Sequence, residues 1–157
     1  MMPHSSCLDF VAVALLGLPS CVARHQSVNA WLVGKLICLM QPILVNREQQ
    51  ESRQQTALAI KSKAEKNEQI LLFPEGTCTN REMIIRFRLG AFLPGKPVQA
   101  IYLKYNYYDN IDNVTWTWEG ASAGGTLLLT LMKWKTDLKI IRLPIYEPGE
   151  SEKQNPM

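Results

Sequence analysis

Apolar and polar positions follow one another along the chain in segments that predict helices and strands in turn. Three mostly apolar segments have helical length, and a fourth, polar segment carries a thin apolar stripe typical of a solvent-facing helix: residues 9–17, 28–39, 120–134 and 48–67. Shorter apolar runs predict strands: residues 20–24, 42–46, 69–73, 97–105, 115–118 and 138–146. Strands alternating with helices predict an α/β fold with a mostly parallel central sheet flanked by helices.

Length and composition fit one globular domain. The chain has 157 residues, of which 46% are apolar and 20% charged. We expect a folded domain over residues 1–146 and a polar tail over residues 147–157. No apolar run reaches the roughly 18 residues of a membrane-spanning helix, and no signal peptide is visible. The four cysteines are irregularly spaced, which favours reduced thiols.

The net charge of +3 is too small to indicate nucleic-acid binding. Charge is distributed unevenly, however. The segment 81–96 holds Arg81, Arg86, Arg88 and Lys96 against one acidic residue, Glu82. These charges predict an anionic ligand near this segment.

The stretch FPEGTCTN, residues 73–80, directly precedes that basic segment. It follows the apolar run 69–73 and then changes abruptly to proline, a carboxylate, glycine and small polar side chains. Ligand sites of α/β sheets collect at the ends of strands. The stretch therefore predicts a site at the end of a buried strand.

A second candidate for chemistry is His4 with Asp9 five positions later. On one continuous helix the two side chains would diverge by about 140°. A contact therefore requires His4 in the loop before a helix and Asp9 in its first turn, with Ser5 or Ser6 as candidate N-cap. A carboxylate on one imidazole nitrogen would leave the other free to take a proton from a hydroxyl. The competing interpretation is a frayed terminal histidine without function.

Taken together, these residues resemble the 1-acylglycerol-3-phosphate O-acyltransferase (glycerolipid acyltransferase) superfamily. His4-x-x-x-x-Asp9 followed by Phe73-Pro-Glu-Gly-Thr77 matches its catalytic blocks, and the full FPEGTCTN resembles the lysophosphatidylcholine acyltransferase branch. The segment 42–47, which ends in Arg47, and the segment 90–98 match two further blocks. The resemblance runs from residue 3 to about residue 144.

This resemblance implies a transfer of a fatty acyl group from acyl-CoA to the free hydroxyl of a lysophospholipid. It implies that His4 is the general base and that Asp9 orients it. Substrate-binding roles fall on a larger set: Arg47, Glu75, Gly76, Thr77, Arg88, Gly90 and Pro97. Among these, Arg47 and the turn 75–77 would hold the glycerol-phosphate part, with Glu75 holding a loop or a hydroxyl. Gly90 and Pro97 would shape the acyl or CoA side.

The resemblance also implies partners and a location. We expect acyl-CoA as co-substrate, no cofactor, no metal and no nucleic acid, and a membrane surface of the endoplasmic reticulum as the place of work. Relative to the family pattern, the membrane helices and the strand that precede the histidine are missing, so we expect a truncated acyltransferase fold. Two alternatives stay open: an inactive lipid-binding module, and a hydrolase, although the chain has no G-x-S-x-G motif.

Overall fold

The computed structural model describes residues 1–29, 31–46, 51–106, 114–117 and 120–154. The chain divides into two compact units. The first comprises Met1–Ala12, Phe73–Arg88 and Gln99–Tyr146; the second comprises Val13–Leu72, Leu89–Val98 and Glu147–Met157. Helix α1 (Asp9–Leu15) begins in the first unit and ends in the second.

The second unit contains a parallel three-stranded sheet. Its strands are β1 (Ser20–Arg24), β2 (Ile43–Val45) and β3 (Ile70–Leu71), in the order β2-β1-β3. Val22 pairs with Ile43 and Ser20 pairs with Ile70. Parallel strands need crossover connections, and both connections in this sheet contain helices. The 3-10 helix η1 (His25–Asn29) and α2 (Trp31–Leu39) connect β1 to β2, and α3 (Glu51–Glu65) connects β2 to β3.

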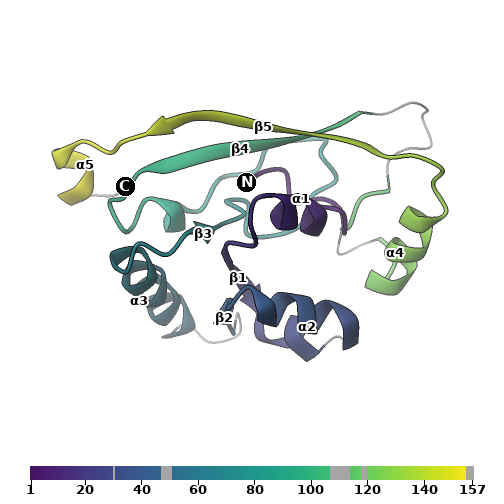
Figure 1. Cartoon of the computed structure of the whole chain (residues 1–157), viewed down its shortest axis with the longest axis horizontal. Helices are drawn as coiled ribbons and strands as arrows, with labels where there is room; N and C mark the ends of the chain where they lie inside the picture. Colours follow the sequence, from purple (N-terminus) through teal and green to yellow (C-terminus); the bar gives the residue numbers. More distant parts are fainter. Residues whose placement is uncertain (30, 47–50, 107–113, 118–119, 155–157) are drawn as a thin grey trace. The chain divides into compact units, whose positions relative to one another are not determined.

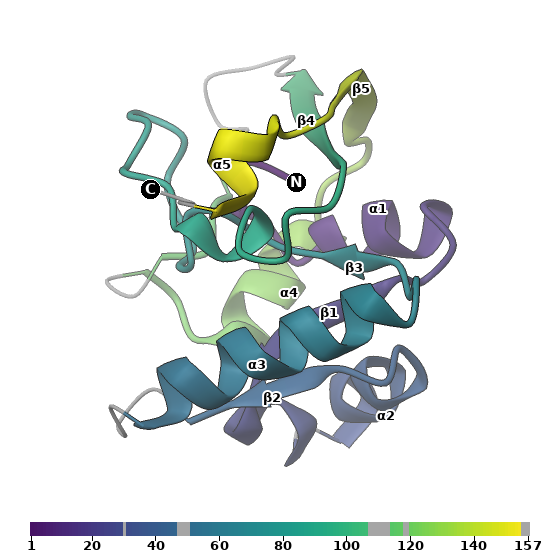
Figure 2. The same cartoon turned by 90° about the vertical axis from the view of Figure 1, so that its left-hand side faces the viewer.

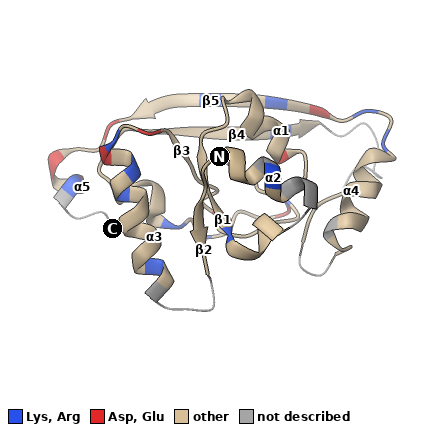
Figure 3. Cartoon of the chain, turned by 60° about the horizontal axis from the view of Figure 1, so that its bottom comes forward, with Lys and Arg blue, Asp and Glu red and all other residues tan. Residues whose placement is uncertain are grey.

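Helix α3 packs beside β2 and β3 (Figure 2). It is a polar helix, with charged positions along its length (Figure 3). Its buried positions are Ser52 and Ile60, which are eight residues apart and therefore share one face. Leu58 is 67% exposed, so the apolar stripe expected on this helix does not include it. The 3-10 helix η2 (Leu89–Ala91) and α5 (Glu150–Gln154) complete the second unit.

The first unit contains a second sheet, made of β4 (Val98–Asn106) and β5 (Asp137–Tyr146). The two strands lie side by side and run in opposite directions (Figure 1). Between them in sequence comes α4 (Ala123–Leu131), whose N-cap Ser122 accepts a hydrogen bond from the Gly125 N–H at 3.3 Å. On β4 the buried side chains are Leu103 and Tyr105, two positions apart on one face of the strand.

The structure confirms the predicted α/β class and its parallel sheet, and it changes three details. β4 and β5 form a separate sheet instead of extending the parallel one. Residues 114–117 are not a strand, although a strand was predicted at 115–118; residue 118 lies outside the described residues. Part of the expected polar tail is helical, as α5. Across the described ranges, every helix is too short or too polar to cross a bilayer.

Candidate active site

The side chains of His4 and Asp9 are in direct contact within the first unit. His4 precedes α1 in a loop and Asp9 is the first residue of that helix, the arrangement that their spacing required. The imidazole Nδ1 lies 2.9 Å from Asp9 Oδ2. The His4 side chain is 27% exposed, whereas that of Asp9 is 1% exposed. The carboxylate therefore holds Nδ1 from the interior and sets the orientation of the ring.

Asp9 is bound by more donors than His4 alone. Its Oδ2 accepts hydrogen bonds from the backbone N–H groups of Ser5 at 2.7 Å and Ser6 at 3.1 Å, which close the turn before α1. Its Oδ1 accepts a hydrogen bond from the Tyr105 hydroxyl, which comes from β4. Burial, together with the negative charge of Asp9, raises the pKa of Tyr105 well above its usual range, so this hydroxyl stays a donor.

Sequence reasoning missed Tyr105. It lies 96 positions from Asp9, and no local pattern connects the two. One signal was present: Tyr105 stands at the end of a predicted strand, on the same face as Leu103. A tyrosine on a buried strand face needs a hydrogen-bond partner for its hydroxyl.

Glu75 holds the backbone of His4. Its Oε2 accepts a hydrogen bond from the His4 N–H at 2.7 Å, and its Oε1 lies 3.4 Å from the Thr79 hydroxyl. Thr79 in turn donates its N–H to the His4 carbonyl at 2.8 Å. Phe73 stacks on the imidazole with ring centroids 4.0 Å apart. The FPEGTCTN stretch therefore contacts His4 on its ring and on both sides of its peptide backbone.

Gly76 and Arg88 lie against each other at this turn. Gly76 has φ of 65°, and a Cβ atom at this position would lie 3.0 Å from Arg88 Nε. Both the backbone conformation and the neighbouring guanidinium therefore favour glycine. The Gly76 N–H donates to the Phe73 carbonyl at 3.0 Å, so it closes the turn. Thr77, the next residue, is exposed.

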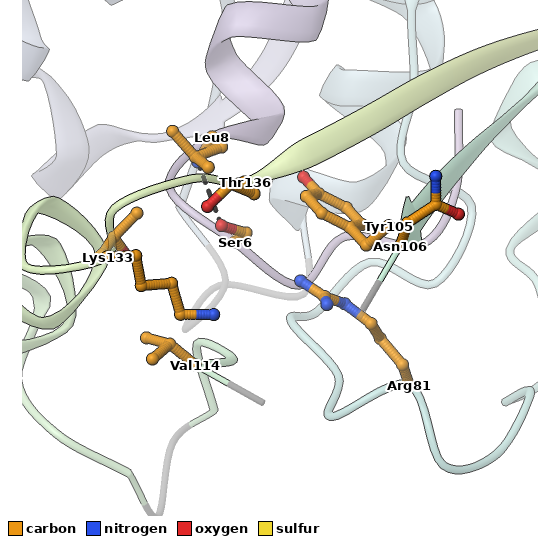
Figure 4. Close-up of a pocket in the computed structure, with 9 residues that line it drawn as sticks. Ser6, Leu8, Arg81, Tyr105, Asn106, Val114, Lys133 and Thr136 are labelled. Atoms are coloured by element: carbon orange, nitrogen blue, oxygen red, sulfur yellow. Dashed lines mark hydrogen bonds between the residues drawn. The ribbon is translucent and has the colours of Figure 1, made fainter. Parts of the chain in front are cut away.

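Arg81 connects the same stretch to Tyr105. Its guanidinium carbon lies 3.9 Å from the centroid of the Tyr105 ring, and its Nε donates to Ser5 Oγ at 2.6 Å. Both residues line a small pocket, with Lys133 on its other side (Figure 4). The cation on the ring face gives Tyr105 a second contact that keeps its hydroxyl directed at Asp9.

The protonation of His4 depends on its two partners. Burial lowers its pKa, but the hydrogen bonds of Asp9 and Cys78 and their electrostatic interactions with the imidazole outweigh burial and raise the pKa to about 9. At pH 7 roughly 1% of an imidazole with this pKa is neutral. At pH 7 the site therefore holds mostly imidazolium, and the neutral base forms at alkaline pH.

The family resemblance gives substrate-binding roles to three further residues: Arg47, Gly90 and Pro97. Arg47 lies outside the described residues. Gly90 and Pro97 belong to the second unit. A Cβ atom at Gly90 would lie 3.8 Å from Ile60 Cδ1, an ordinary packing distance that does not itself require glycine. Their roles on the acyl or CoA side stay predictions. In the part of the chain that the structure describes, no group of three or more His, Cys, Asp and Glu could hold a metal ion.

Comparison with known proteins identifies the chain as a relative of acyl-transferring enzymes. The sequence profile of the acyltransferase family matches residues 1–96, more than half of the chain, and these residues include His4, Asp9 and FPEGTCTN. The chain belongs to the acyltransferase family.

Within that family, the resemblance to the lysophosphatidylcholine acyltransferase branch is confirmed. Lysophosphatidylcholine acyltransferase 2B of Rattus norvegicus is 46% identical over 99% of this chain and 30% of its own length. Lysophosphatidylcholine acyltransferase 2 of Mus musculus and lysophosphatidylcholine acyltransferase 1 of Homo sapiens are each 42% identical over 99% of this chain and 29% of theirs. The chain thus spans about 30% of the length of these relatives. No solved structure matches it significantly.

Proposed function

We propose that this acyltransferase moves a fatty acyl group from acyl-CoA to the free hydroxyl of a lysophospholipid, as in phospholipid synthesis and remodelling. The observation that carries the proposal is the His4 site. An imidazole bound by a buried carboxylate is held through its backbone by the glutamate of FPEGT, in a family whose members transfer acyl groups.

In the proposed reaction, neutral His4 removes the proton from the acceptor hydroxyl through Nε2. The oxygen attacks the thioester carbonyl of acyl-CoA, a C–O bond forms and the C–S bond breaks. The thiolate of coenzyme A leaves with the proton that His4 received. Asp9 holds the Nδ1–H tautomer and stabilises the imidazolium that forms. Positioning and one base suffice, so no covalent enzyme intermediate and no cofactor are needed.

The acceptor phosphate would be held by groups around the turn 75–77. Arg88 lies against Gly76, and Thr77 is exposed beside it. A guanidinium suits phosphate because it offers several donors in a planar fork. Arg47, placed by the resemblance in the same role, would add a second cation. Glu75 supports this site by holding His4 and not by touching phosphate, since a carboxylate repels an anion.

The acceptor is a membrane lipid, so we place the reaction at the surface of the endoplasmic reticulum membrane, as the family resemblance implies. Nothing in the proposed chemistry involves nucleic acid. Gly90 and Pro97 would lie on the acyl or CoA side of the substrate.

The test is acyl transfer from labelled acyl-CoA to a panel of lysophospholipids in detergent, with His4→Ala and His25→Ala compared. His25 is the second of two histidines and is exposed, so it is a matched control. We expect His4→Ala to lower the rate by about 100- to 10,000-fold and His25→Ala to leave it unchanged. Equal loss in both variants, or no transfer by the folded chain, would refute the proposal. Hydrolysis of acyl-CoA at the same rate without acceptor would indicate a hydrolase instead.

A further inference from the structure

Helix α4 buries its hydroxyl-bearing face. Thr126 is 2% exposed and Thr130 is 8% exposed, and the two are four positions apart on one side of the helix. Thr130 donates its hydroxyl to the Thr126 carbonyl at 2.7 Å and accepts a hydrogen bond from the Cys7 thiol at 3.4 Å. The Thr126 hydroxyl donates to the Ala121 carbonyl at 3.2 Å. The interior side of α4 is therefore hydrogen-bonded and polar.

The outer side of α4 carries large apolar side chains instead. Leu128 is 60% exposed and Leu131, three positions later on the same face, is 72% exposed. Four neighbouring apolar side chains are also exposed: Leu127, Leu129, Met132 and Trp134. An exposed apolar cluster of this kind is typical of a surface that binds another protein or a membrane. We call it the leucine face, defined as residues 127–129, 131, 132 and 134.

The charged residues of the segment 120–136 favour an anionic partner for this face. Residues 120–136 include Lys133 and Lys135 and no acidic residue. Lys135 lies 3.4 Å from Asp137, the next acid along the chain, and its side chain remains 62% exposed. Apolar side chains followed by tryptophan and lysine are typical of a helix that lies in the interface of a bilayer with anionic lipids.

The length of α4 excludes a spanning arrangement. Its nine residues rise about 14 Å, against roughly 30 Å for the hydrocarbon core of a bilayer. An interfacial helix needs only to bury one face. Its buried threonines hold the other face against the protein.

We propose that the leucine face of α4 inserts into the surface of anionic phospholipid membranes and docks this acyltransferase on the layer that holds its acceptor. The choice of a lipid surface as partner rests on the proposed function, whereas the exposed leucines and the lysines do not.

The experiment measures binding of the whole chain to sedimented vesicles of phosphatidylcholine with 30% phosphatidylserine, and of phosphatidylcholine alone. Leu128→Gln with Leu131→Gln tests the face. Leu15→Gln with Leu58→Gln is the matched control, because these leucines are 70% and 67% exposed on other helices. We expect the test pair to weaken binding about tenfold for each leucine, the control pair to change it less than twofold, and phosphatidylcholine alone to bind more weakly.

Brominated lipids give a direct readout, because they should quench the tryptophan emission of the wild-type chain more strongly than that of Trp134→Phe, which keeps the other three tryptophans. Equal vesicle affinity of the test pair and the wild type would overturn the proposal. A wild-type chain that is a dimer in sedimentation analysis, and a monomer with the two leucines replaced, would also overturn it. A second copy of the chain would then cover the leucine face. A test pair that fails to fold, while the control pair folds, would show these leucines to be core residues and would also refute it.

Activity separates this inference from the proposed function. With a short-chain acceptor that is monomeric in solution, the test pair should transfer acyl groups at the wild-type rate. Loss of vesicle binding with intact transfer supports the docking surface. If neither the wild type nor any variant transfers acyl groups, the proposed function is refuted. The docking surface is then tested by vesicle binding alone.

Discussion

Replacing Tyr105 by phenylalanine tests how the site controls its base. The substitution removes only the hydroxyl that donates to Asp9 Oδ1 and keeps the ring on which Arg81 stacks. Asp9 retains its donors on Oδ2, from His4 and from the backbone of Ser5 and Ser6. The variant therefore removes the hydroxyl's hydrogen bond to a buried charge, together with its hydrogen bond to Ser6.

The size of the effect follows from the burial of that charge. A hydrogen bond to a charged group contributes about 1.5–3 kcal/mol, so we expect the free energy of unfolding to fall by about 2 kcal/mol. A carboxylate with one donor fewer binds the His4 proton more tightly, which raises the pKa of His4 above its value of about 9. Each rise of half a unit lowers the neutral fraction about threefold at pH 7.5.

Two measurements check this reasoning. The first is kcat/KM for acyl transfer between pH 6 and 10, where we expect the midpoint to move to higher pH. The second is NMR titration of the imidazole protons, which can be assigned by removing His25, the only other histidine. Tyr102→Phe, on the same strand at an exposed position, is the matched control. A Tyr105→Phe titration that overlays both the wild type and Tyr102→Phe would refute the argument.

Three further predictions concern the same site. Cys78→Ala should lower the pKa of His4 and shift the pH–rate midpoint to lower pH, whereas Cys7→Ala, also half-buried, should leave it unchanged. Gly76→Ala should lower the unfolding free energy in urea by about 1–2 kcal/mol because of its positive φ; Gly124→Ala, which meets no atom within 4 Å, should not destabilise. The pKa of His4 is higher in the folded chain than its unfolded value of 6.5. Protonation of His4 therefore adds about 3 kcal/mol to the free energy of unfolding below pH 6.5, and this contribution disappears as the pH rises through 9. Unfolding free energies of the wild type and His4→Gln that change equally with pH would contradict it.

Much of the architecture could be predicted from local patterns. The strand at residues 20–24 is observed as β1 with the same bounds, and the helices and strands around it differ by a few residues at their ends. Local geometry showed how the side chains of His4 and Asp9 could meet, and the family resemblance favoured this pair over a frayed histidine; the structure shows the contact. Periodicity and capping act over one or two turns of chain, so they can be read from neighbours in the sequence.

Other features depend on where distant segments meet. The interior face of α4 is an example: a run of leucines between threonines predicts a helix, but only the packing shows that Thr126 and Thr130 face inward and the leucines outward. The separate pairing of β4 with β5 is another, because an apolar run predicts a strand but does not by itself say which strand lies beside it.

Short stretches of the chain encode the α/β class, the order of elements and the FPEGTCTN turn, so these could be predicted from the sequence. The family resemblance added the pairing of His4 with Asp9. The folded chain was needed to show that Glu75 holds the His4 backbone, that Tyr105 binds Asp9, and that Cys78 helps to raise the pKa of His4. These partners are 71, 96 and 74 positions away in the chain. Burial strengthens the hydrogen bonds and charge interactions between these residues, and these residues are buried only after the chain has folded.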